Sequence, residues 1–404
     1  MTWLGRLLLR RFWWTIALAG ALGEWTLVCA LVDPPLAPLW HVVAVVLLTL
    51  LNRAAAEGYE REAPDGHLPK RAAQAVLATG FVSAAGALTL GAAAMGWMVV
   101  DRLGALPADA GQLAAAAAPF LGPGFAAVAW PSVALVMLVA TWGYVAGHRR
   151  LRVTPLLVSL PGLPPALDGL RIVHLSDLHL GPLADRAALG DVVARLAEID
   201  PDVIVVTGDV VDSKRTDLEA WVPALASIGA RHGVYAILGN HDEGAGLDRV
   251  AAAIARHTTW TLLRDTVAPV TLHGATLWLV GLEYRDTAAA CAVLPELLAQ
   301  VPAGDAAVLL CHHPAIYETA ARLGVPLTLA GHTHGGQLAV PGLPRLNPAR
   351  ILMTRFDAGT FARHGTLLHV NRGLGISGQR IRVGAPREIT VVTLLSPSAA
   401  AGAA

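Results

Sequence analysis

A pair of side chains with metal-binding chemistry stands at the end of an apolar run. The run Leu170–Val173 leads into His-Leu-Ser-Asp-Leu-His-Leu-Gly, which places Asp177 and His179 two residues apart. In extended backbone, residues i and i+2 point to the same side of a strand. A carboxylate and an imidazole that leave one strand end together would supply half of a metal site. The D-x-H spacing alone is a weak signal, because two polar residues in a loop are usually just solvated.

Four further polar clusters follow later apolar runs in the same way. They are Gly208-Asp209 after Val203–Thr207, Gly239-Asn240-His241-Asp242 after Val234–Leu238, His312-His313-Pro314 after Ala307–Cys311, and Gly331-His332-Thr333-His334-Gly335-Gly336-Gln337 after Leu327–Ala330. Taken singly, each cluster also reads as a turn, a helix cap or a polar loop. In open α/β sheets, however, sites collect at the carboxyl ends of strands. Five such ends therefore indicate one shared site.

The donor types in these clusters restrict the metal. Carboxylate, amide and imidazole ligands without thiolate suit Mn, Fe or Zn. The donors are numerous enough for two ions, and a pair of ions about 3.5–4 Å apart can share a carboxylate and a hydroxide and clamp a phosphoryl group.

The segments that would position these clusters alternate between strand and helix. Further buried-strand candidates are Leu277–Gly281, Leu367–Val370 and Ile389–Leu395, and helical stretches include Arg186–Ile199 and Leu247–His257. This alternation predicts an α/β domain. Four prolines between Thr154 and Asp168 predict a linker. The expected organisation is a transmembrane domain over residues 1–152, a Pro-rich linker over 153–168, a catalytic domain over 169–396 and a disordered tail over 397–404.

The first 150 residues have the composition of a membrane protein. Charged residues make up 15% of the chain, against about 25% in average soluble proteins, and the deficit is concentrated before residue 150. Four apolar runs predict about four transmembrane helices: Phe12–Val32, Leu36–Leu51, Ala72–Val100 and Gly124–Gly147. Basic residues precede the first run, fill the loop after the second and follow the fourth. By the positive-inside rule this pattern places both ends and the catalytic domain in the cytoplasm.

Two features of the first run have alternative explanations. Arg10-Arg11-Phe12 faintly resembles a twin-arginine export signal, but the surrounding residues fit that signal poorly. Glu24 falls in the middle of the run, where an ionisable group is a functional hypothesis by default. The favoured alternative is that Glu24 faces the bundle interior and bonds to a neighbour such as His41. The scarcity of charges in the four runs argues against an ion or solute pathway.

Charge and cysteine content exclude several other classes. Thirty Lys and Arg residues balance thirty Asp and Glu residues, and no basic stripe indicates a nucleic-acid partner. Cys29, Cys291 and Cys311 have no C-x-x-C spacing, which argues against a disulfide framework or a thiolate metal site. The sequence contains neither a P-loop nor a G-x-S-x-G elbow.

The ordered motifs D-x-H, G-D, G-N-H-D, H-x-P and G-H-T-H resemble those of the calcineurin-like metallophosphoesterase superfamily. The stretches G-H-T-H-G-G-Q and Val370-Asn371-Arg372-Gly373-Leu374-Gly375 further resemble its membrane-associated bacterial phosphodiesterase branch. The resemblance covers about Leu170–Leu395 and leaves out the apolar half. It implies a sandwich of two β-sheets flanked by helices, which the predicted all-α transmembrane bundle would precede. Together with this resemblance to a bacterial branch, the four apolar runs predict a multi-pass protein of the bacterial inner (cytoplasmic) membrane.

The resemblance assigns a role to each motif residue. It implies Asp177, His179 and His334 as ligands of a first divalent ion, Asn240, His312 and His332 as ligands of a second, Asp209 as the bridge, His241 as general acid and Asp242 as the residue that orients its ring. His313 occupies a variable position and has no assigned role. Arg372 and Gln337 are candidate substrate-binding residues, with a turn or salt-bridge role as an open alternative. The loop Glu283-Tyr284-Arg285 reads as solvated rather than as pocket lining.

The implied activity is metal-dependent hydrolysis of a phosphoester, with two divalent ions as cofactors and Mn expected to support activity in vitro. A phosphodiester is the favoured substrate class. The membrane location also favours a lipid-linked case, such as the pyrophosphate of UDP-2,3-diacylglucosamine. The alternative is a membrane scaffold or sensor with a non-hydrolytic domain. Such a protein would be expected to have lost a ligand, and none is missing.

Overall fold

The chain divides into two compact units, Met1–Val145 and Ala146–Ala404. The computed structural model describes residues 12–32, 38–59, 76, 78–80, 82–89, 123–182, 184–340 and 342–397. Each unit is described by itself.

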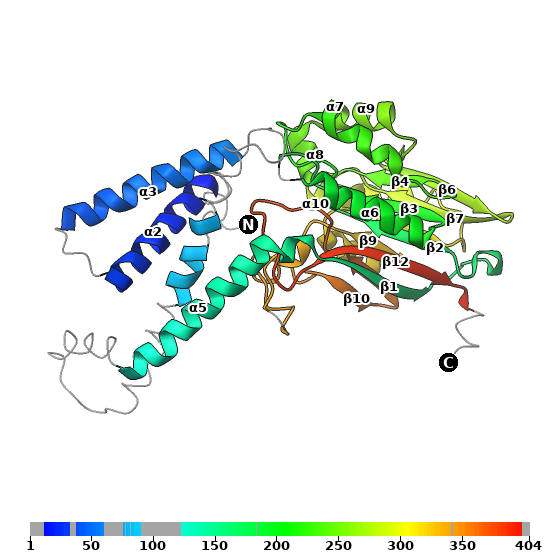
Figure 1. The fold of residues 1–404 in the computed structure, drawn as a ribbon. Coiled ribbons are helices and arrows are strands. Elements are labelled where there is room, and N and C mark those ends of the chain that lie inside the picture. The colour runs from blue at the N-terminus through cyan, green and yellow to red at the C-terminus, as the bar shows by residue number, and fades with distance from the viewer. Residues whose placement is uncertain are drawn as a thin grey trace. The chain divides into compact units, whose positions relative to one another are not determined.

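The first unit contains three long helices that coincide with predicted apolar runs (Figure 1): α2 (Phe12–Val32), α3 (Pro38–Tyr59) and α5 (Pro123–Val145). Within the described ranges, one stretch, Ala129–Arg149, is long and apolar enough to cross a membrane. The third run, Ala72–Val100, lies largely outside the described residues. The bundle of four spans therefore stays a prediction.

The first unit also contains a polar contact between two helices. Asn52 is buried on α3, and its Nδ2 donates a hydrogen bond to Glu24 Oε2 on α2 at 3.2 Å. His41 instead accepts from Trp25 Nε1 at 3.1 Å. Glu24 thus bonds to a neighbour as predicted, but that neighbour is Asn52 instead of His41.

The positive-inside orientation, the twin-arginine alternative and the disordered tail were predicted partly from residues outside the described ranges. These residues are Arg6, Arg10, Arg11, Arg61, Lys70, Arg71 and Arg102, and the tail from residue 398.

The second unit is built on two six-stranded sheets. The first sheet has the order β1 (Leu151–Ser159), β12 (Arg387–Leu395), β2 (Arg171–Leu175), β3 (Val203–Thr207), β4 (Val234–Ile237) and β5 (Thr261–Leu262). The second has the order β10 (Gly359–Arg363), β11 (Thr366–Val370), β9 (Leu327–Ala330), β8 (Ala307–Leu310), β7 (Ala275–Gly281) and β6 (Thr266–Leu272). Neighbouring strands are parallel except at β12–β2, β10–β11 and β6–β7.

Helices cover the outer faces of both sheets (Figure 1). The longer helices of this unit are α6 (Arg186–Ile199), α9 (Leu247–His257) and α10 (Thr287–Leu298). The shorter ones are α7 (Leu218–Trp221), α8 (Asn240–Ala245), α11 (Tyr317–Arg322) and α12 (Pro348–Leu352), and the 3-10 turns are η3 (Gly147–Arg149), η4 (Pro165–Leu167), η5 (Val222–Ser227), η6 (Pro314–Ile316) and η7 (His334–Gly336).

Strand β3 shows how the layers pack. Val203 and Val205 belong to the core between the sheets, whereas Ile204 and Val206 belong to the core beneath α6 and α9. Because both faces of such a strand are buried, it reads as a continuous apolar run. The predicted sandwich of two sheets flanked by helices is therefore confirmed.

The predicted linker over 153–168 is wrong for its first half. Strand β1 pairs in parallel with β12 along its whole length, from Leu151↔Arg387 to Ser159↔Leu395. It lies at the edge of the first sheet, where Pro155 is tolerated because an edge strand pairs on one side only. The prolines that suggested a linker thus mark an edge strand followed by a turn.

Two neighbouring residues of β1 test whether this strand is part of the folded core. Val158 is 1% exposed, and Leu157 is 68% exposed. Val158→Ala removes buried methyl groups and should cost about 1–3 kcal/mol of unfolding free energy, which a thermal melt would register as a lowered Tm. Leu157→Ala, the matched control, should leave Tm nearly unchanged. Equal melts for the two variants would contradict the assignment of β1 to the core.

Candidate metal centre

The polar loops after five strands meet at one edge of the sandwich. The loop after β2 is pinned to the loop after β3, since Asp177 N donates to Gly208 O at 2.9 Å and His179 N donates to Asp209 O at 3.0 Å. In the second sheet, Gly331 N after β9 donates to the carbonyl of His312 after β8 at 3.1 Å. These backbone bonds fix where the polar side chains point.

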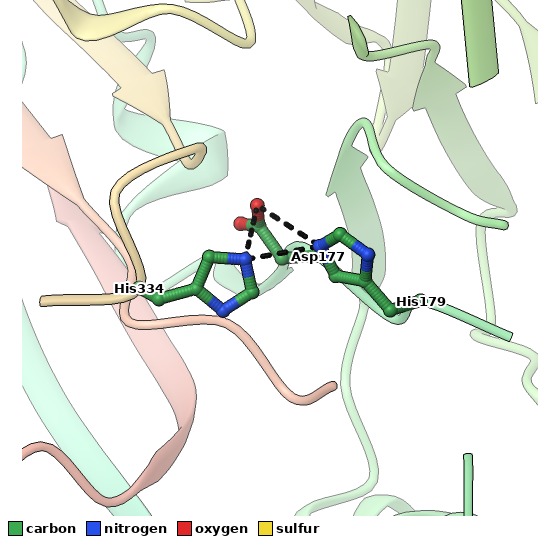
Figure 2. A group of neighbouring side chains, drawn as sticks. All are labelled: Asp177, His179 and His334. Atoms are coloured by element: carbon green, nitrogen blue, oxygen red, sulfur yellow. Dashed lines mark hydrogen bonds and ion pairs between the residues drawn. The ribbon is translucent and has the colours of Figure 1, made fainter. Parts of the chain in front are cut away.

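Asp177, His179 and His334 form one buried trio (Figure 2). The two histidine Nε2 atoms are 3.0 Å apart. Asp177 Oδ1 lies 3.4 Å from His334 Nε2 and 4.0 Å from His179 Nε2. Three donor atoms from two different sheets thus face a common point.

Asn240, His312 and His332 form a second group. Asn240 Oδ1 lies 3.0 Å from His312 Nε2 and 2.8 Å from His332 Nδ1, and the two imidazole nitrogens are 3.3 Å apart. This group therefore presents one amide oxygen and two nitrogens to a second point.

Asp209 joins the two groups through a single oxygen. Its Oδ2 lies 3.5 Å from His179 Nε2 of the first group and 3.3 Å from His312 Nε2 of the second. The Asp209 carboxylate is 2% exposed, and its other oxygen accepts from His241 N at 2.9 Å. All seven residues that the sequence suggested as ligands are thus brought together.

The donor set fits a pair of divalent cations. Atoms that each bind one cation at about 2.0–2.2 Å lie roughly 3.0–3.5 Å from one another, and most of the observed donor separations fall in that range. The donors are nitrogen and oxygen without sulfur, a set that suits Mn, Fe or Zn.

Hydrogen bonds behind the ligands set which imidazole nitrogen faces the site. His312 Nδ1 lies 2.7 Å from the carbonyl of Thr207, and His179 Nδ1 lies 3.3 Å from Asp212 Oδ1. Because a carbonyl or carboxylate only accepts, each Nδ1 carries the hydrogen and each Nε2 offers its lone pair. The two rings are therefore oriented as ligands.

The pKa shifts of the buried site residues favour the binding of cations. Burial alone would raise the pKa of Asp209, but the charge and hydrogen bond of His312, together with His179, hold that pKa well below its usual value. Burial, with help from neighbouring positive charge, holds the pKa values of His332 and His334 well below 6.5. Burial opposes charge on His312 as well, yet the Asp209 carboxylate raises its pKa to about 9. A bound cation would take the place of that proton.

Five of the seven ligand candidates have left-handed backbone. The φ angles are 51° at Asp177, 46° at His179, 53° at Asp209, 74° at His332 and 52° at His334. The expectation that Asp177 and His179 converge from extended backbone is therefore wrong. Their side chains meet because both residues leave the strand conformation, at a cost that non-glycine residues bear mainly at functional sites.

The predicted partner of His241 is also wrong. Asp242 accepts from the backbone N–H groups of Gly239, Val210 and Val211 at 2.8–3.1 Å, so it braces the loop instead of orienting the histidine ring. Adjacent residues on a helix do not face each other. Burial and the charge of Asp209 raise the pKa of Asp242 to about 7.

Asp212 takes the role that the sequence assigned to Asp242. Its backbone carbonyl lies 2.5 Å from His241 Nδ1, and its carboxylate contacts His179 Nδ1. The side chains of Asp212, His179 and His241 form a further cluster next to the first trio. Sequence reasoning missed Asp212 because it belongs to no motif; the only signal is its place three residues after Asp209.

The two candidate substrate residues are engaged elsewhere. Arg372 Nη1 donates to both carboxylate oxygens of buried Glu388 at 3.0 Å. The side-chain amide of Gln337 bonds to the backbone of Ser377 in both directions, at 2.8 and 2.9 Å. Their contacts fit the salt-bridge and turn alternatives.

Tyr284 lies closer to the centre than the sequence indicated. Glu283 and Arg285 on either side form ion pairs with Arg264 and Asp265. The Tyr284 ring packs edge-on against His312 with centroids 5.9 Å apart. The loop after β7 therefore contributes an aromatic side chain beside the second ligand group.

Comparison with known proteins agrees with this geometry. Residues 170–336 match the family model of the calcineurin-like phosphoesterases. The chain is 31% identical over 238 residues to the uncharacterized metallophosphoesterase YkuE of Bacillus subtilis, a match that covers 58% of this chain and 82% of that protein. The chain belongs to the calcineurin-like metallophosphoesterase superfamily. It is accordingly a metal-dependent phosphoric ester hydrolase by family, and the family uses divalent metals.

Two other relatives carry informative names. A transmembrane protein with metallophosphoesterase domain from Danio rerio is 28% identical over 280 residues, which cover 64% of this chain and 61% of that protein. The UDP-2,3-diacylglucosamine pyrophosphatase LpxG of Chlamydia trachomatis is 26% identical over 337 residues, which cover 68% of this chain and 99% of that protein. The name of the first relative thus describes a transmembrane protein, and the name of the second describes a pyrophosphatase that acts on UDP-2,3-diacylglucosamine.

A glycine pair tests how tightly the backbone packs on the bridging carboxylate. A Cβ on Gly239 would overlap Asp209 Oδ1 and lie 2.6 Å from Asp209 N, whereas a Cβ on Gly229 would meet nothing within 4 Å. Neither glycine has a positive φ, so the difference is steric. Gly239→Ala should lose most bound metal, measured as metal per purified chain, and Gly229→Ala should retain it. Full metal content in Gly239→Ala would contradict the geometry around Asp209.

Proposed function

We propose that the chain is a membrane-anchored dinuclear metallophosphoesterase that hydrolyses a phosphodiester or pyrophosphate bond. The observation that supports this most is the shared oxygen of Asp209, which lies within 3.5 Å of a nitrogen in each ligand group. Asp177, His179 and His334 would hold one ion, Asn240, His312 and His332 the other, and Asp209 both. Bound ions would supply positive charge to the phosphoryl oxygens and a nucleophilic water at neutral pH.

His241 would act as the general acid. Its Nδ1 lies 2.5 Å from the carbonyl of Asp212, which only accepts, so the Nδ1 hydrogen stays in place. Nε2 is then the atom that gives a proton to the leaving oxygen, and the ring ends as the neutral tautomer that Asp212 already favours. The side chain is 30% exposed, and its ring centroid lies 4.5 Å from that of His179. It is accessible to a substrate beside the first ion site.

A lipid-linked phosphoester or pyrophosphate is the proposed substrate class, and Mn, Fe or Zn the proposed metal, with Mn supporting activity in vitro. Two observations support the substrate class: the stretch Ala129–Arg149, which is able to cross a membrane, and the similarity to LpxG over nearly all of that protein's length. A non-hydrolytic scaffold or sensor is the weaker alternative because all seven ligand candidates are present and converge.

The location that we propose is the bacterial inner membrane, crossed several times, with the catalytic unit in the cytoplasm. Helices lie over three of the four apolar runs, and among the described residues the stretch Ala129–Arg149 is the one long and apolar enough to cross a membrane. Relatives described as transmembrane support a membrane protein.

Replacing His241 tests the chemistry. His241→Ala should retain two metals per chain and lose about 10²–10⁴-fold in kcat on alkyl phosphodiesters, because a poor leaving group needs its proton. The loss on p-nitrophenyl esters, whose leaving group needs little protonation, should be much smaller. Purified protein with Mn supplied would be assayed on both substrates. Equal losses on the two would count against a general acid, and activity without any metal would count against the whole proposal.

Protease access tests the orientation. In spheroplasts with an intact inner membrane, externally added protease should leave the catalytic unit uncut, and opening the membrane should expose it. The protein should also stay with the membrane after alkaline carbonate extraction, since a spanning helix is not released by charge or pH. Cleavage of the catalytic unit in unopened spheroplasts would place it outside and refute the cytoplasmic assignment.

A further inference from the structure

An exposed apolar segment follows the loop that carries His332 and His334. Between Leu338 and Phe356, six large apolar side chains are 42–78% exposed: Val340, Leu343, Leu346, Ile351, Leu352 and Met353. Elsewhere in the described part of the catalytic unit, large apolar side chains with comparable exposure are Val153, Leu157 and Leu323. Such concentration of exposed apolar surface marks an interaction site.

Hydrogen bonds join the described residues of the segment, 338–340 and 342–356. Leu346 N donates to Leu343 O at 2.8 Å, and Val340 N donates to Leu346 O at 3.1 Å, which closes a turn. Asn347 then caps α12, since its Oδ1 accepts from Arg350 N at 2.9 Å. The turn and the helix are therefore adjacent and ordered.

The middle of the segment and its C-terminal end are anchored to the loop that carries His332 and His334. Asn347 is buried against Gly336, where a Cβ would lie 2.7 Å from Asn347 Oδ1. Asn347 Nδ2 also donates to Asp357 Oδ2 at 2.6 Å, and the Asp357 carbonyl accepts from Thr333 Oγ1. Thr333 stands between the ligand candidates His332 and His334. The apolar side chains are thus tied to the metal centre through a few bonds.

The charges of the segment point to an anionic partner. Residues Leu338–Phe356 include Arg345, Arg350 and Arg355 and no Asp or Glu. Arg350 pairs with Asp357 and Arg355 with Glu318 outside the segment, and Arg345 is exposed. Exposed aliphatic side chains with interspersed arginines are the composition of segments that lie in the interface of a bilayer, and anionic lipids attract such arginines.

We propose that Leu338–Phe356 docks into the interface of an anionic lipid bilayer and holds the metal centre at the membrane surface. This goes beyond the proposed function, because it assigns a role to residues outside the metal centre. It does not require hydrolysis, so it can fail while the enzyme assignment stands.

Fluorescence quenching in proteoliposomes tests the docking with the full chain. Leu352→Cys would carry an environment-sensitive nitrobenzoxadiazole label, in a background with Cys29→Ser and Cys291→Ser. The third native cysteine, Cys311, is retained because it is fully buried. Leu157→Cys is the matched control, since Leu157 is 68% exposed on β1 and Leu352 78% exposed. Vesicles would be phosphatidylcholine with or without phosphatidylglycerol, each with and without nitroxide-labelled lipid. Ile351→Cys provides a second position, and thermal melts verify that each variant folds.

Quenching by nitroxide lipid should be several-fold stronger at residue 352 than at residue 157, and phosphatidylglycerol should increase it. Arg345→Gln should weaken the response to phosphatidylglycerol. Equal quenching at residues 352 and 157 would overturn the proposal. So would protection of residue 352 from both nitroxide lipid and aqueous iodide, because that result would mean that protein covers the segment.

Discussion

The carboxylate of Asp209 lies almost fully buried within reach of imidazole nitrogens from both sheets. A buried carboxylate is costly unless it is paired and hydrogen-bonded. Here the charge of His312 and the N–H of His241 provide partial compensation, and cations would provide the rest. The position of this carboxylate requires that the ends of β2, β3, β4 and β8 be held within a few ångströms of each other. The two-sheet architecture satisfies that requirement.

Rigidity around Asp209 comes from backbone more than from side chains. Both residues of the pair Asp177 and His179, and both of the pair His332 and His334, have left-handed backbone. This conformation is unfavourable for an isolated non-glycine residue. They persist because neighbouring loops hold them: Asp177 N bonds to Gly208 O, and Leu374 N bonds to Ser176 O. The buried strands beneath provide the stability that keeps this arrangement in place. These backbone bonds therefore fix the positions of the ligand candidates, and a fixed ligand set limits the reorganisation that ion binding requires.

The candidate metal centre has three kinds of neighbour: an aromatic ring, a partly exposed histidine and an apolar segment. The aromatic ring of Tyr284 packs edge-on against His312, while His241 is partly open to solvent. The segment after Gln337 adds exposed aliphatic side chains that are anchored to the same loop as two ligand candidates. Polar metal-ligand candidates and exposed apolar side chains are thus connected through the same loop.

The helices and strands that have a local pattern of apolar residues could be predicted from the sequence alone. The bounds of β3, β9, α6 and α9 agree with those read from the sequence, because strands buried on both faces and amphipathic helices have recognisable periodicities. Polar clusters at strand ends indicated a shared site, and the resemblance to the superfamily then implied which of their residues are ligands.

Strand pairing and side-chain contacts between residues far apart in the sequence were visible only in the folded structure. Strand β1 pairs with a strand more than 230 residues away, so its prolines read as a linker until that partner is seen. Asp212 rather than Asp242 faces His241, because the direction of a side chain at a helix start depends on local dihedral angles that no motif encodes. Arg372 and Gln337 point to Glu388 and Ser377. A sequence reports which donors and acceptors exist, but only the folded chain selects the atoms that satisfy them.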